Sequence, residues 1–465
     1  MPLLLVACAA QKPSPDAGAT APEQWQAPLP GDYGLLPHSG MLTDLSQWWQ
    51  QHGDPLLVRL IDAAQAASPT LASAKSRIGQ ARAERVAAGA ALLPTLDAAV
   101  SATRKSAQPP LPANTVVQAG LDSAWEIDLF GGNRASRNAA QARLEGAQAG
   151  WHEARVSVAA EVANLYYGLR ACERQLAITV ADAASRAEIA RLSRLSADAG
   201  FQAPATAALA RASAAEGSAR ATQQRALCDI DIKALAALTA IPEPELRQSL
   251  SASALPASEQ SPPVVISSLP ARTLTQRPDV FTAEREVDAA SANLGSVEAQ
   301  RYPRLTLSGS VGVARFRAAG LSDDLSTWSI GPLALSMPIY DGGRRAANIE
   351  AARARYEEAV ANYRARVRQA VREVEEALVN LQSTSARRDD VLAAAQGYRV
   401  SFNATESRYK NGLASLVELE ETRRTMLAAD SVVVTLERER RAAWIALYRA
   451  AGGGWTPPAE ISAQR

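Results

Sequence analysis

Long stretches without proline constrain the fold of this chain more than any other feature of its sequence. Roughly 65 residues without proline follow the motif LFGGNR, and a similar stretch without proline runs from YDGGRR to the break at Asn411 and Gly412. At a rise of 1.5 Å per residue, each run would make a helix about 100 Å long. Such a helix is longer than a compact domain can use, so the sequence predicts an elongated helical assembly.

Apolar residues recur at heptad spacing within both runs. They are Leu144, Trp151, Val158 and Leu165 in the first run and Val360, Val367, Val374 and Leu381 in the second. This spacing indicates that the helices pack along their length in the manner of a coiled coil. An ordinary elongated coiled coil would show the same periodicity, so the pattern alone does not reject that alternative.

The same order of signals occurs twice along the chain. The paired landmarks are Pro94 with Pro303, Gly131 with Gly342 and Gly200 with Gly412, at a nearly constant offset of about 210 residues, which indicates a duplication. Each half reads as a helix, two strands, a long helix and a shorter helix. The predicted segments are residues 1–8 (a signal that lacks its beginning), 9–53 (spacer and equatorial segment), 54–240 (first repeat), 241–277 (equatorial connection), 278–451 (second repeat) and 452–465 (tail).

Two segments in each half change from helical periodicity to strict alternation. The predicted strands are residues 95–104, 116–129, 304–316 and 327–339. In the third, Leu305 and Val311 face one way while Thr306 faces the other, as in a strand between lipid and water. The fourth changes phase across Gly331 and Pro332, which indicates a β-bulge. Each segment is long enough to cross a bilayer at a tilt.

No apolar window approaches the roughly 18 residues of a membrane-spanning helix, which leaves a closed barrel of alternating strands as the way to cross a bilayer. Four strands with open edges cannot lie in hydrocarbon, so several chains would have to close one barrel. Two chains would give eight strands and a filled interior, whereas three would give twelve strands and a lumen. A soluble sandwich shows similar alternation, so the strand pattern alone is weak evidence.

Glycines mark the tips of two predicted helical hairpins. Gly200 and Gly412 suit the left-handed residue that ends a helix before the chain turns back. After the second tip, Ser415 and Glu418 form an S-x-x-E capping box, and Glu421 lies one turn further along. Glu418 also has a purely structural explanation, because an acidic residue at a helix start opposes the helix dipole.

The three cysteines fall into two groups. Cys8 ends the apolar run MPLLLVAC, which is similar to the end of a bacterial lipoprotein signal whose charged beginning is missing, so we expect Cys8 to be lipidated. A chance cysteine near an ordinary secretory signal is the alternative. Cys172 and Cys228 lie almost equally far on either side of the predicted turn at Phe201, which would place them level on antiparallel helices. An oxidising compartment would permit a disulfide, but two buried free cysteines are the preferred interpretation.

Family motifs occur along nearly the whole chain. They are Trp48 and Trp49 followed by GDPLLVRLI, then LLPTL, WEIDLFGG, TQRPDVFTAERE, YPRLTLSG, WSIGPLALSMPIYDGGRR and RYKNGLASLVELEETRR. Together these motifs are highly specific, whereas GDP or DGGR alone would be weak. With them the chain resembles the TolC-type outer-membrane efflux channels, in particular the lipoprotein branch that includes OprM and the NodT-like proteins.

The resemblance implies an α+β membrane protein that assembles as a homotrimer. Four strands per chain would make a twelve-stranded barrel in the outer membrane, continuous with a long helical barrel in the periplasm. Glu418 and Glu421 would ring the closed periplasmic aperture. The hairpin tips would contact a periplasmic adaptor, through Gly200, Phe201, Asn411, Gly412, Leu413 and Ser415. The first tip, GFQAPATAAL, departs from the usual family pattern.

We therefore expect a lipid-anchored outer-membrane exit duct of a tripartite RND-type efflux system, which passively conducts drugs or other small toxic compounds and is opened by its pump and adaptor. We expect no enzymatic activity, cofactor or metal site, because His38, His52 and His152 lack ligand-like spacing and no P-loop occurs. The 49 basic and 48 acidic residues favour no nucleic-acid partner. A type I protein-secretion duct and a periplasmic coiled-coil adaptor are the alternatives, and the sequence does not identify the exported substrate.

Overall fold

The structure of the protein is a computed structural model that describes residues 26–27, 49, 54–106, 113–253, 274 and 277–455. Its helices are α2 (Pro55–Ala67), α3 (Pro69–Ala90), α4 (Gly132–Asp198), α5 (Pro204–Thr239), α6 (Glu243–Ala252), α7 (Pro278–Ala299), α8 (Arg344–Ala386), α9 (Arg388–Lys410), α10 (Leu416–Ala450) and the short η3 (Gly452–Gly454). Its strands are β1 (Thr95–Lys105), β2 (Asn114–Ile127), β3 (Arg304–Ala318) and β4 (Leu321–Ser336). Several of these helices begin with proline. The first N–H groups of a helix have no acceptor within the helix, so the missing N–H of proline costs no hydrogen bond there.

The described chain divides into two compact units. The first contains Ala74–Gly150 and Asp279–Arg366, and therefore the whole sheet. The second contains Trp151–Pro278 and Val367–Arg465, together with the chain that precedes Ala74 from Thr20 onward. None of the described helices is both long and apolar enough to cross a membrane.

The two long runs without proline behave differently. The first forms α4, which continues for 67 residues as the sequence predicts. The second is divided at Arg387 into α8 and α9. Arg387 itself keeps right-handed helical backbone angles, with φ −80° and ψ −13°. No proline or glycine marks this position, so the interruption carries no sequence signal.

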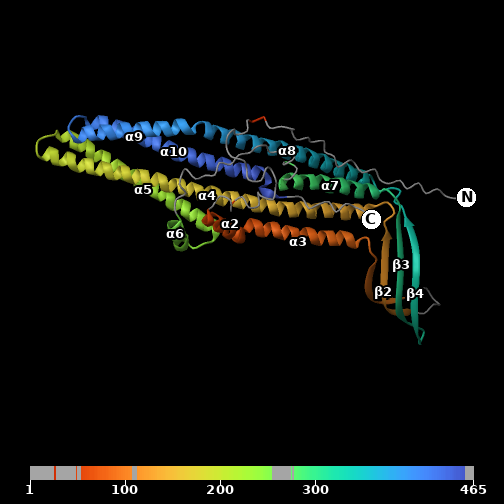
Figure 1. Ribbon diagram of the computed structural model, residues 1–465. Helices are drawn as coiled ribbons and strands as arrows, with labels where there is room; N and C mark the ends of the chain where they lie inside the picture. The colour runs from red at the N-terminus through yellow and green to blue at the C-terminus, as the bar shows by residue number, and fades with distance from the viewer. Residues whose placement is uncertain are drawn as a thin grey trace. The chain divides into compact units, whose positions relative to one another are not determined.

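In the first unit, α7 packs against both α4 and α8, and Figure 1 shows these three helices side by side. Alanines make the contact with α4, through Ala139 and Ala142 on α4 and Ala289 and Ala292 on α7. The contact with α8 also includes larger side chains. Val287 and Ala290 on α7 pack there with Tyr356, Ala359 and Val360 on α8. Small side chains let two helix axes approach closely, which accounts for the alanine content of these helices.

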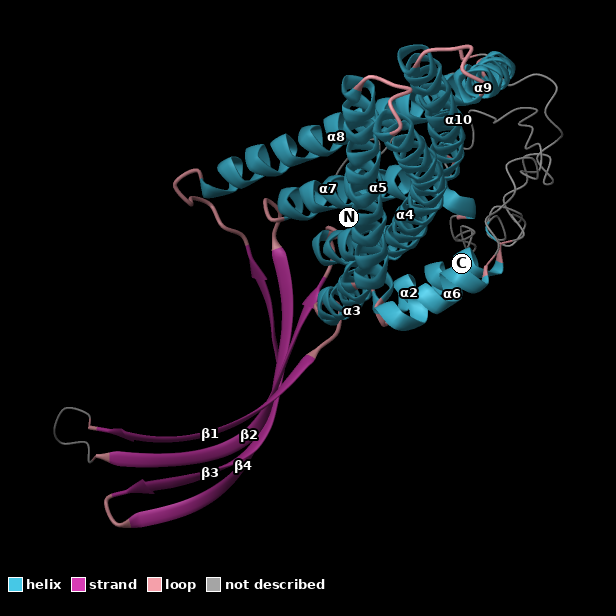
Figure 2. Cartoon of the chain, turned by 90° about the vertical axis from the view of Figure 1, so that its left-hand side faces the viewer, coloured by secondary structure: helices cyan, strands magenta, loops and turns pink. Residues whose placement is uncertain are grey.

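The sheet has the order β1-β2-β3-β4, and every neighbouring pair is antiparallel (Figure 2). The predicted bulge is confirmed, because Leu307 pairs with Leu333 whereas Gly309 pairs with Ile330. Gly331 and Pro332 therefore lie opposite Ser308 alone. The bulge restores the apolar residues of β4 to one face of the sheet.

The turn between β3 and β4 is tighter than the sequence predicts. Ala319 and Gly320 are the two turn residues, and both have positive φ, 49° and 85°. Paired positive φ angles match the right-handed twist of the flanking strands. Because the turn needs only two residues, both strands extend closer to it than the predicted segments 304–316 and 327–339.

In the second unit, Asp54 connects the start of α2 to the middle of α4. Its carboxylate accepts hydrogen bonds from the N–H groups of Leu56 (3.1 Å) and Leu57 (3.2 Å), which caps the helix. It also accepts a 2.6 Å hydrogen bond from the hydroxyl of Tyr166. Burial, together with this bond, raises the pKa of Tyr166 to about 12, so the phenol keeps the proton that it donates.

Candidate functional site

The two hairpin tips have the same backbone geometry. Gly200 and Gly412 have φ angles of 79° and 76°, as expected for a left-handed residue that ends a helix. In both tips the next N–H group donates to a carbonyl five residues back. These bonds join Phe201 to Ser196 and Leu413 to Arg408, each at 2.8 Å. Two Schellman-type turns in corresponding positions agree with the predicted duplication.

The second tip continues into a capped helix start. The hydroxyl oxygen of Ser415 accepts a 3.1 Å hydrogen bond from the N–H of Glu418. In a full capping box, the Glu418 side chain would also accept a hydrogen bond from the N–H of Ser415. The described residues do not make this second bond, so that half of the predicted capping box is wrong. The Glu418 carboxylate instead accepts from Arg408 at 2.8 Å. A charge-assisted bond to a guanidinium is the stronger alternative.

Both predicted aperture carboxylates lie exposed in the first turns of α10, and each has an arginine partner within its own chain. Arg424 donates to both oxygens of Glu421, at 2.6 and 2.9 Å. Glu418 is paired with Arg408 as described above. Both pairs are exposed, so each stabilises the fold by no more than about 1 kcal/mol. The aperture region is therefore a set of compensated charges and not a purely acidic patch.

Apolar side chains at the tips are strongly exposed in the single chain. Phe201 is 85% exposed and Leu413 is 70% exposed. The Asn411 side chain donates to the carbonyl of Ser407 at 2.8 Å, which closes the end of α9. Exposed apolar residues on rigid turns are suited to contact with another protein.

Below the tips, four helices share one apolar cluster. Its buried members are Ile189 on α4, Ala210 on α5, Phe402 on α9, and Leu416 and Leu419 on α10. Tyr409 packs against this cluster, and its hydroxyl lies 3.0 Å from that of Ser193 on α4. The two hairpins of one chain are therefore held together just beneath their tips.

A buried charged cluster follows, centred on Arg423. Its side chain is only 1% exposed, and it contacts Glu420 at 2.8 Å, Asp182 at 3.6 Å and Ser185 at 3.1 Å. The guanidinium also lies over the ring of Phe402 at 5.4 Å. Burial lowers the pKa of Arg423 while Glu420 raises it, and an arginine remains a cation under either influence.

Arg186 belongs to the same cluster and is also buried. It donates to Asp182 at 2.8 and 3.0 Å, to Ser213 at 2.6 Å and to Glu420 at 2.7 Å. These bonds connect α4 with α5 and with α10. Two buried arginines held by two carboxylates satisfy one another only while the helices stay in register.

Close approach of α4 and α5 depends on Gly217. A Cβ atom at this position would lie 2.8 Å from Cδ of Arg186 and 3.4 Å from Cα of Ala183. Arg186 is held by three partners, so it has no free direction in which to move. Gly217 thus gives the space in which the charged cluster forms.

Sequence reasoning missed Asp182, Arg186, Arg423 and Gly217. A charged residue in a long helix is most often solvated. The available signal was the spacing of Asp182 and Arg186, four residues apart, but exposed pairs have the same spacing. Burial arises only from packing of α4 against α10, which no local pattern encodes.

The two remaining cysteines form a disulfide between α4 and α5. Cys172 and Cys228 have Cα atoms 5.6 Å apart and are 56 residues apart in sequence. The preferred prediction of two free cysteines is wrong, whereas their level position on antiparallel helices is confirmed. The sequence spacing of two cysteines cannot predict whether they form a disulfide. It fixes their height along the two helices but not the rotation of each helix about its axis.

A groove of about 510 Å³ lies between α4 and α5 below the first tip. Small residues line its floor, namely Ala190, Ala197, Ala207 and Ala208. Arg191, Arg194 and Arg211 lie along it with Asp198, so its charge is predominantly basic. Arg191 is engaged by Glu188 at 2.7 Å.

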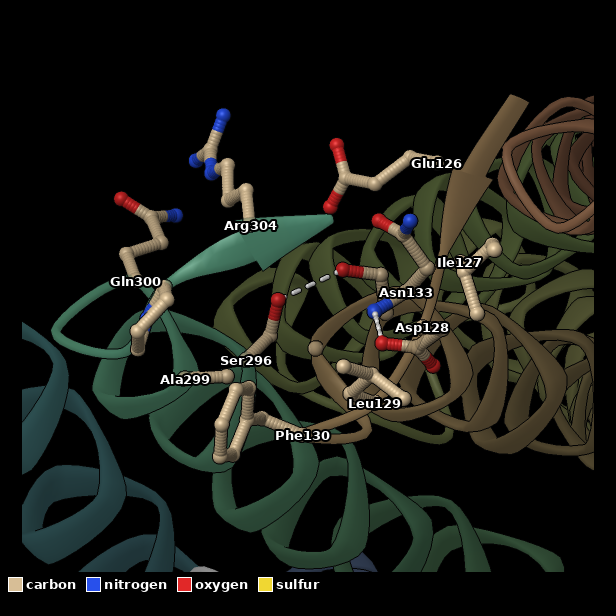
Figure 3. A pocket seen from close by; sticks show the side chains of 13 residues that line it. Glu126, Ile127, Asp128, Leu129, Phe130, Asn133, Ser296, Ala299, Gln300 and Arg304 are labelled. Atoms are coloured by element: carbon tan, nitrogen blue, oxygen red, sulfur yellow. Dashed lines mark hydrogen bonds between the residues drawn. The ribbon is translucent and has the colours of Figure 1, made fainter. Parts of the chain in front are cut away.

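A second cavity, of about 150 Å³, lies where β2 passes into α4 (Figure 3). Asp128 caps α4 there by accepting from the N–H groups of Asn133 and Arg134. The hydroxyl oxygens of Ser136 and Ser296 lie 2.7 Å apart and connect α4 to α7. These groups satisfy one another and fix the junction of strand and helix. The described residues contain no group of histidine, cysteine or carboxylate side chains placed to bind a metal ion.

One face of the sheet is apolar across all four strands. A typical row consists of Ala98, Leu121, Val311 and Trp328. Val100, Trp328 and Ile330 are 79%, 77% and 84% exposed, so no described part of the chain covers this face. The opposite face is polar, with a row formed by Asp97, Asp122, Ser310 and Ser329. An exposed apolar face of this size indicates contact with lipid or another protein.

The outer membrane efflux protein model matches residues 60–240 and 269–453. The chain belongs to the outer membrane efflux protein family. This outer membrane efflux protein is 30% identical to the pyoverdine export outer membrane protein OpmQ of Pseudomonas aeruginosa, over 97% of the chain and 95% of that protein. It is 28% identical to the solvent efflux pump outer membrane protein SrpC of Pseudomonas putida, over 94% of the chain and 93% of that protein. The solved outer-membrane channel OprN matches with a TM-score of 0.81 at 26% identity, over 97% of this chain and 100% of that chain.

These findings confirm the predicted resemblance, the α+β channel fold and the role as an outer-membrane efflux duct. The family is one of channels and not of enzymes. A type I secretion duct and a periplasmic adaptor are not favoured, because the matching family is one of outer membrane efflux proteins and the solved neighbour OprN is an outer-membrane channel. Cys8, His38 and His52 lie outside the described residues.

Proposed function

We propose that three copies of this outer membrane efflux protein form the passive exit duct of a tripartite RND-type system that expels small toxic compounds. The observation that carries the proposal is the sheet. Its apolar face is exposed on all four strands, and within the described residues β1 and β4 each pair on one side only. Unpaired backbone groups are costly in hydrocarbon, so the edges need partners from other copies. Three sheets joined at their edges would make twelve strands around a lumen.

The first turns of α10 form the periplasmic aperture in this proposal. Glu418 and Glu421 from each copy would converge on the axis, where like charges repel. Arg408 and Arg424 reduce that repulsion, since each carboxylate already has a guanidinium partner. A closed aperture is then electrostatically tolerable, and opening requires only that the hairpins separate.

Single-channel conductance in planar bilayers tests the aperture. The double variant Glu418→Ala with Glu421→Ala should raise conductance or reduce cation preference. Glu350→Ala with Glu376→Ala is the control, because both carboxylates are exposed on α8 and each is in a looser ion pair with an arginine of the same helix, at 3.9 and 3.6 Å. If the aperture variant conducts with the same amplitude and selectivity as the control, Glu418 and Glu421 do not line the pore.

The basic, alanine-lined groove between α4 and α5 is the proposed contact for the adaptor, together with the exposed tips at Phe201 and Leu413. Alanines admit a partner helix closely, and Arg194 with Arg211 favours acidic side chains on that helix. Arg194→Glu with Arg211→Glu should abolish adaptor recruitment in a pull-down while leaving conductance unchanged. Recruitment that persists would remove the groove from the proposal.

Lipidation at Cys8 would anchor the duct to the membrane. Palmitate labelling of the chain, expressed in bacteria with a lipoprotein signal peptide ahead of Cys8, should be lost in Cys8→Ser. Labelling that survives this substitution would exclude Cys8 as the modified residue. The relatives differ in cargo, because OpmQ is named for pyoverdine export and SrpC for solvent efflux. We infer that the pump selects the compound and that the duct conducts it.

A further inference from the structure

The apolar face of the sheet ends in a basic rim beside the hairpin turns. Arg104 on β1 and Arg317 on β3 lie in one row, on either side of Thr115. Arg315 lies one row nearer the apolar residues, on the same face as Val313. All three arginine side chains are exposed. We call Arg104, Arg315 and Arg317 the basic rim.

Two members of the basic rim are available to a ligand. Arg315 is engaged by Asp324 on β4, through bonds of 2.6 and 2.7 Å. Neither Arg104 nor Arg317 is in ion-pair contact with a carboxylate of the described residues. Their Cα atoms lie two strand spacings apart, about 10 Å. The rim therefore has a net positive charge and two extended donors on one surface.

The position of the rim matches the edge of a bilayer. Five apolar rows, from Leu305 to Val313, span roughly 27 Å at about 3.4 Å per residue. Strands in a membrane barrel tilt by roughly 40°, so these rows cover about 21 Å of depth, close to the apolar band of about 25 Å. Arg315 and Arg317 follow directly beyond this band, at the depth of lipid headgroups. A charge on this face is tolerated at that depth and is unfavourable further in.

The other edge of the band is different. Trp125 lies at that edge, where its indole N–H donates a 3.0 Å hydrogen bond to the carbonyl of Leu92. Tyr340, four residues after the end of β4, is exposed. Trp and Tyr are enriched at both membrane–water interfaces, so these residues mark this edge of the apolar band as an interface. All connections to helices leave the sheet at this edge, and both hairpin turns lie at the opposite one. Within the described strands, the two edges therefore differ in chemistry, because only the edge beside the turns has arginines on the apolar face.

We propose that Arg104 and Arg317 bind the phosphates of a phosphorylated glycolipid in the outer leaflet. The proposal rests on the proposed function, which places the helices in the periplasm and the hairpin turns outside. Guanidinium groups bind phosphate bidentately, and two of them about 10 Å apart suit a headgroup with two separated phosphates. The apolar rows beneath would contact the acyl chains of the same lipid. Binding would hold the outer edge of the sheet at a fixed depth.

Native mass spectrometry of the full-length assembly tests this proposal, with bisphosphorylated lipid A, its dephosphorylated form and phosphatidylglycerol as probes. The wild type should retain the bisphosphorylated glycolipid about tenfold better than either other lipid, since two charge-assisted contacts are available only to it. Arg104→Gln with Arg317→Gln should abolish that preference. Arg104→Lys with Arg317→Lys should retain part of it, because the charge remains while bidentate geometry is lost.

Arg353→Gln with Arg372→Gln is the control, since both arginines are exposed on α8 away from the sheet. The control should bind lipid like the wild type, and all variants should melt at the same temperature in lipid-free detergent. Equal retention of phosphatidylglycerol and the glycolipid would overturn the proposed ligand, and an unchanged preference in the glutamine variant would overturn the site. Conductance in bilayers of neutral lipid separates the proposed lipid site from the proposed function. A protein that conducts there but shows no lipid preference in mass spectrometry refutes only the basic rim.

Discussion

At the scale of single residues, Arg423 makes the most testable contribution to stability. Replacing it with methionine removes one of the two cations that Asp182 and Glu420 share and leaves both carboxylates with Arg186 alone. Breaking a buried pair in this way costs about 3–5 kcal/mol. We expect Arg423→Met to lower the midpoint of urea unfolding of the solubilised protein, followed by the helical circular dichroism signal.

The neighbouring residue is the control. Arg424 is 73% exposed and pairs with Glu421 at the surface. Arg424→Met should change the unfolding free energy by no more than about 1 kcal/mol. Equal unfolding midpoints for the two variants would mean that the charged cluster does not hold the hairpins together.

The conformation and hydrogen bonds of single residues could be predicted where they depend on neighbours in sequence. They could not be predicted where they depend on packing. Gly200 and Gly412 could be identified because a helix that reverses needs a left-handed residue. The cap at Ser415 was equally local. The partners of Glu418 were not, because Arg408 approaches from the other side of the turn and displaces the expected backbone bond.

At the scale of the helix pair, Gly217 sets the distance between α4 and α5. Gly217→Ala would push a methyl group against Arg186, which cannot yield without leaving Asp182. Overpacking of this kind costs about 1–3 kcal/mol. Thermal melting of the solubilised protein should show the loss.

Gly397 in α9 is the matched control, because a Cβ atom there would meet nothing within 4 Å. Gly397→Ala should raise stability by roughly 0.5–1 kcal/mol, since alanine favours the helix more than glycine does. If both alanine variants are stabilised, α4 and α5 do not approach as closely as the structure shows.

The disulfide is a second constraint on the same pair. Cys172→Ser with Cys228→Ser removes a link across 56 residues, and the loss of such a link costs about 2–4 kcal/mol. A reducing agent should lower the melting temperature of the wild type to that of the double variant and leave the double variant unchanged. Melting of the wild type that is insensitive to reduction would show that the bond contributes nothing.

Elements were predictable from periodicity, and their ends were less so. The long α4 and the strands follow from proline-free heptads and from alternation. The division between α8 and α9 at Arg387 has no breaker residue, and the two-residue turn at Ala319 and Gly320 replaced a longer predicted loop. Local geometry of this kind depends on strand twist and helix packing, which appear only once the elements are placed.

At the scale of the whole molecule, we infer that the exposed apolar face and the sheet edges, which lack a second strand partner within the described residues, are completed by other copies of the chain. A surface this apolar is not stable in water, and open edges are not stable in lipid. The sequence could indicate this requirement because four strands are too few to close on themselves.

The number of chains in the detergent-solubilised particle, measured by native mass spectrometry, tests this requirement most directly. The account predicts three chains per particle, held together without any ligand. A particle that contains a single folded chain, with the edges of its sheet unpaired, would contradict it.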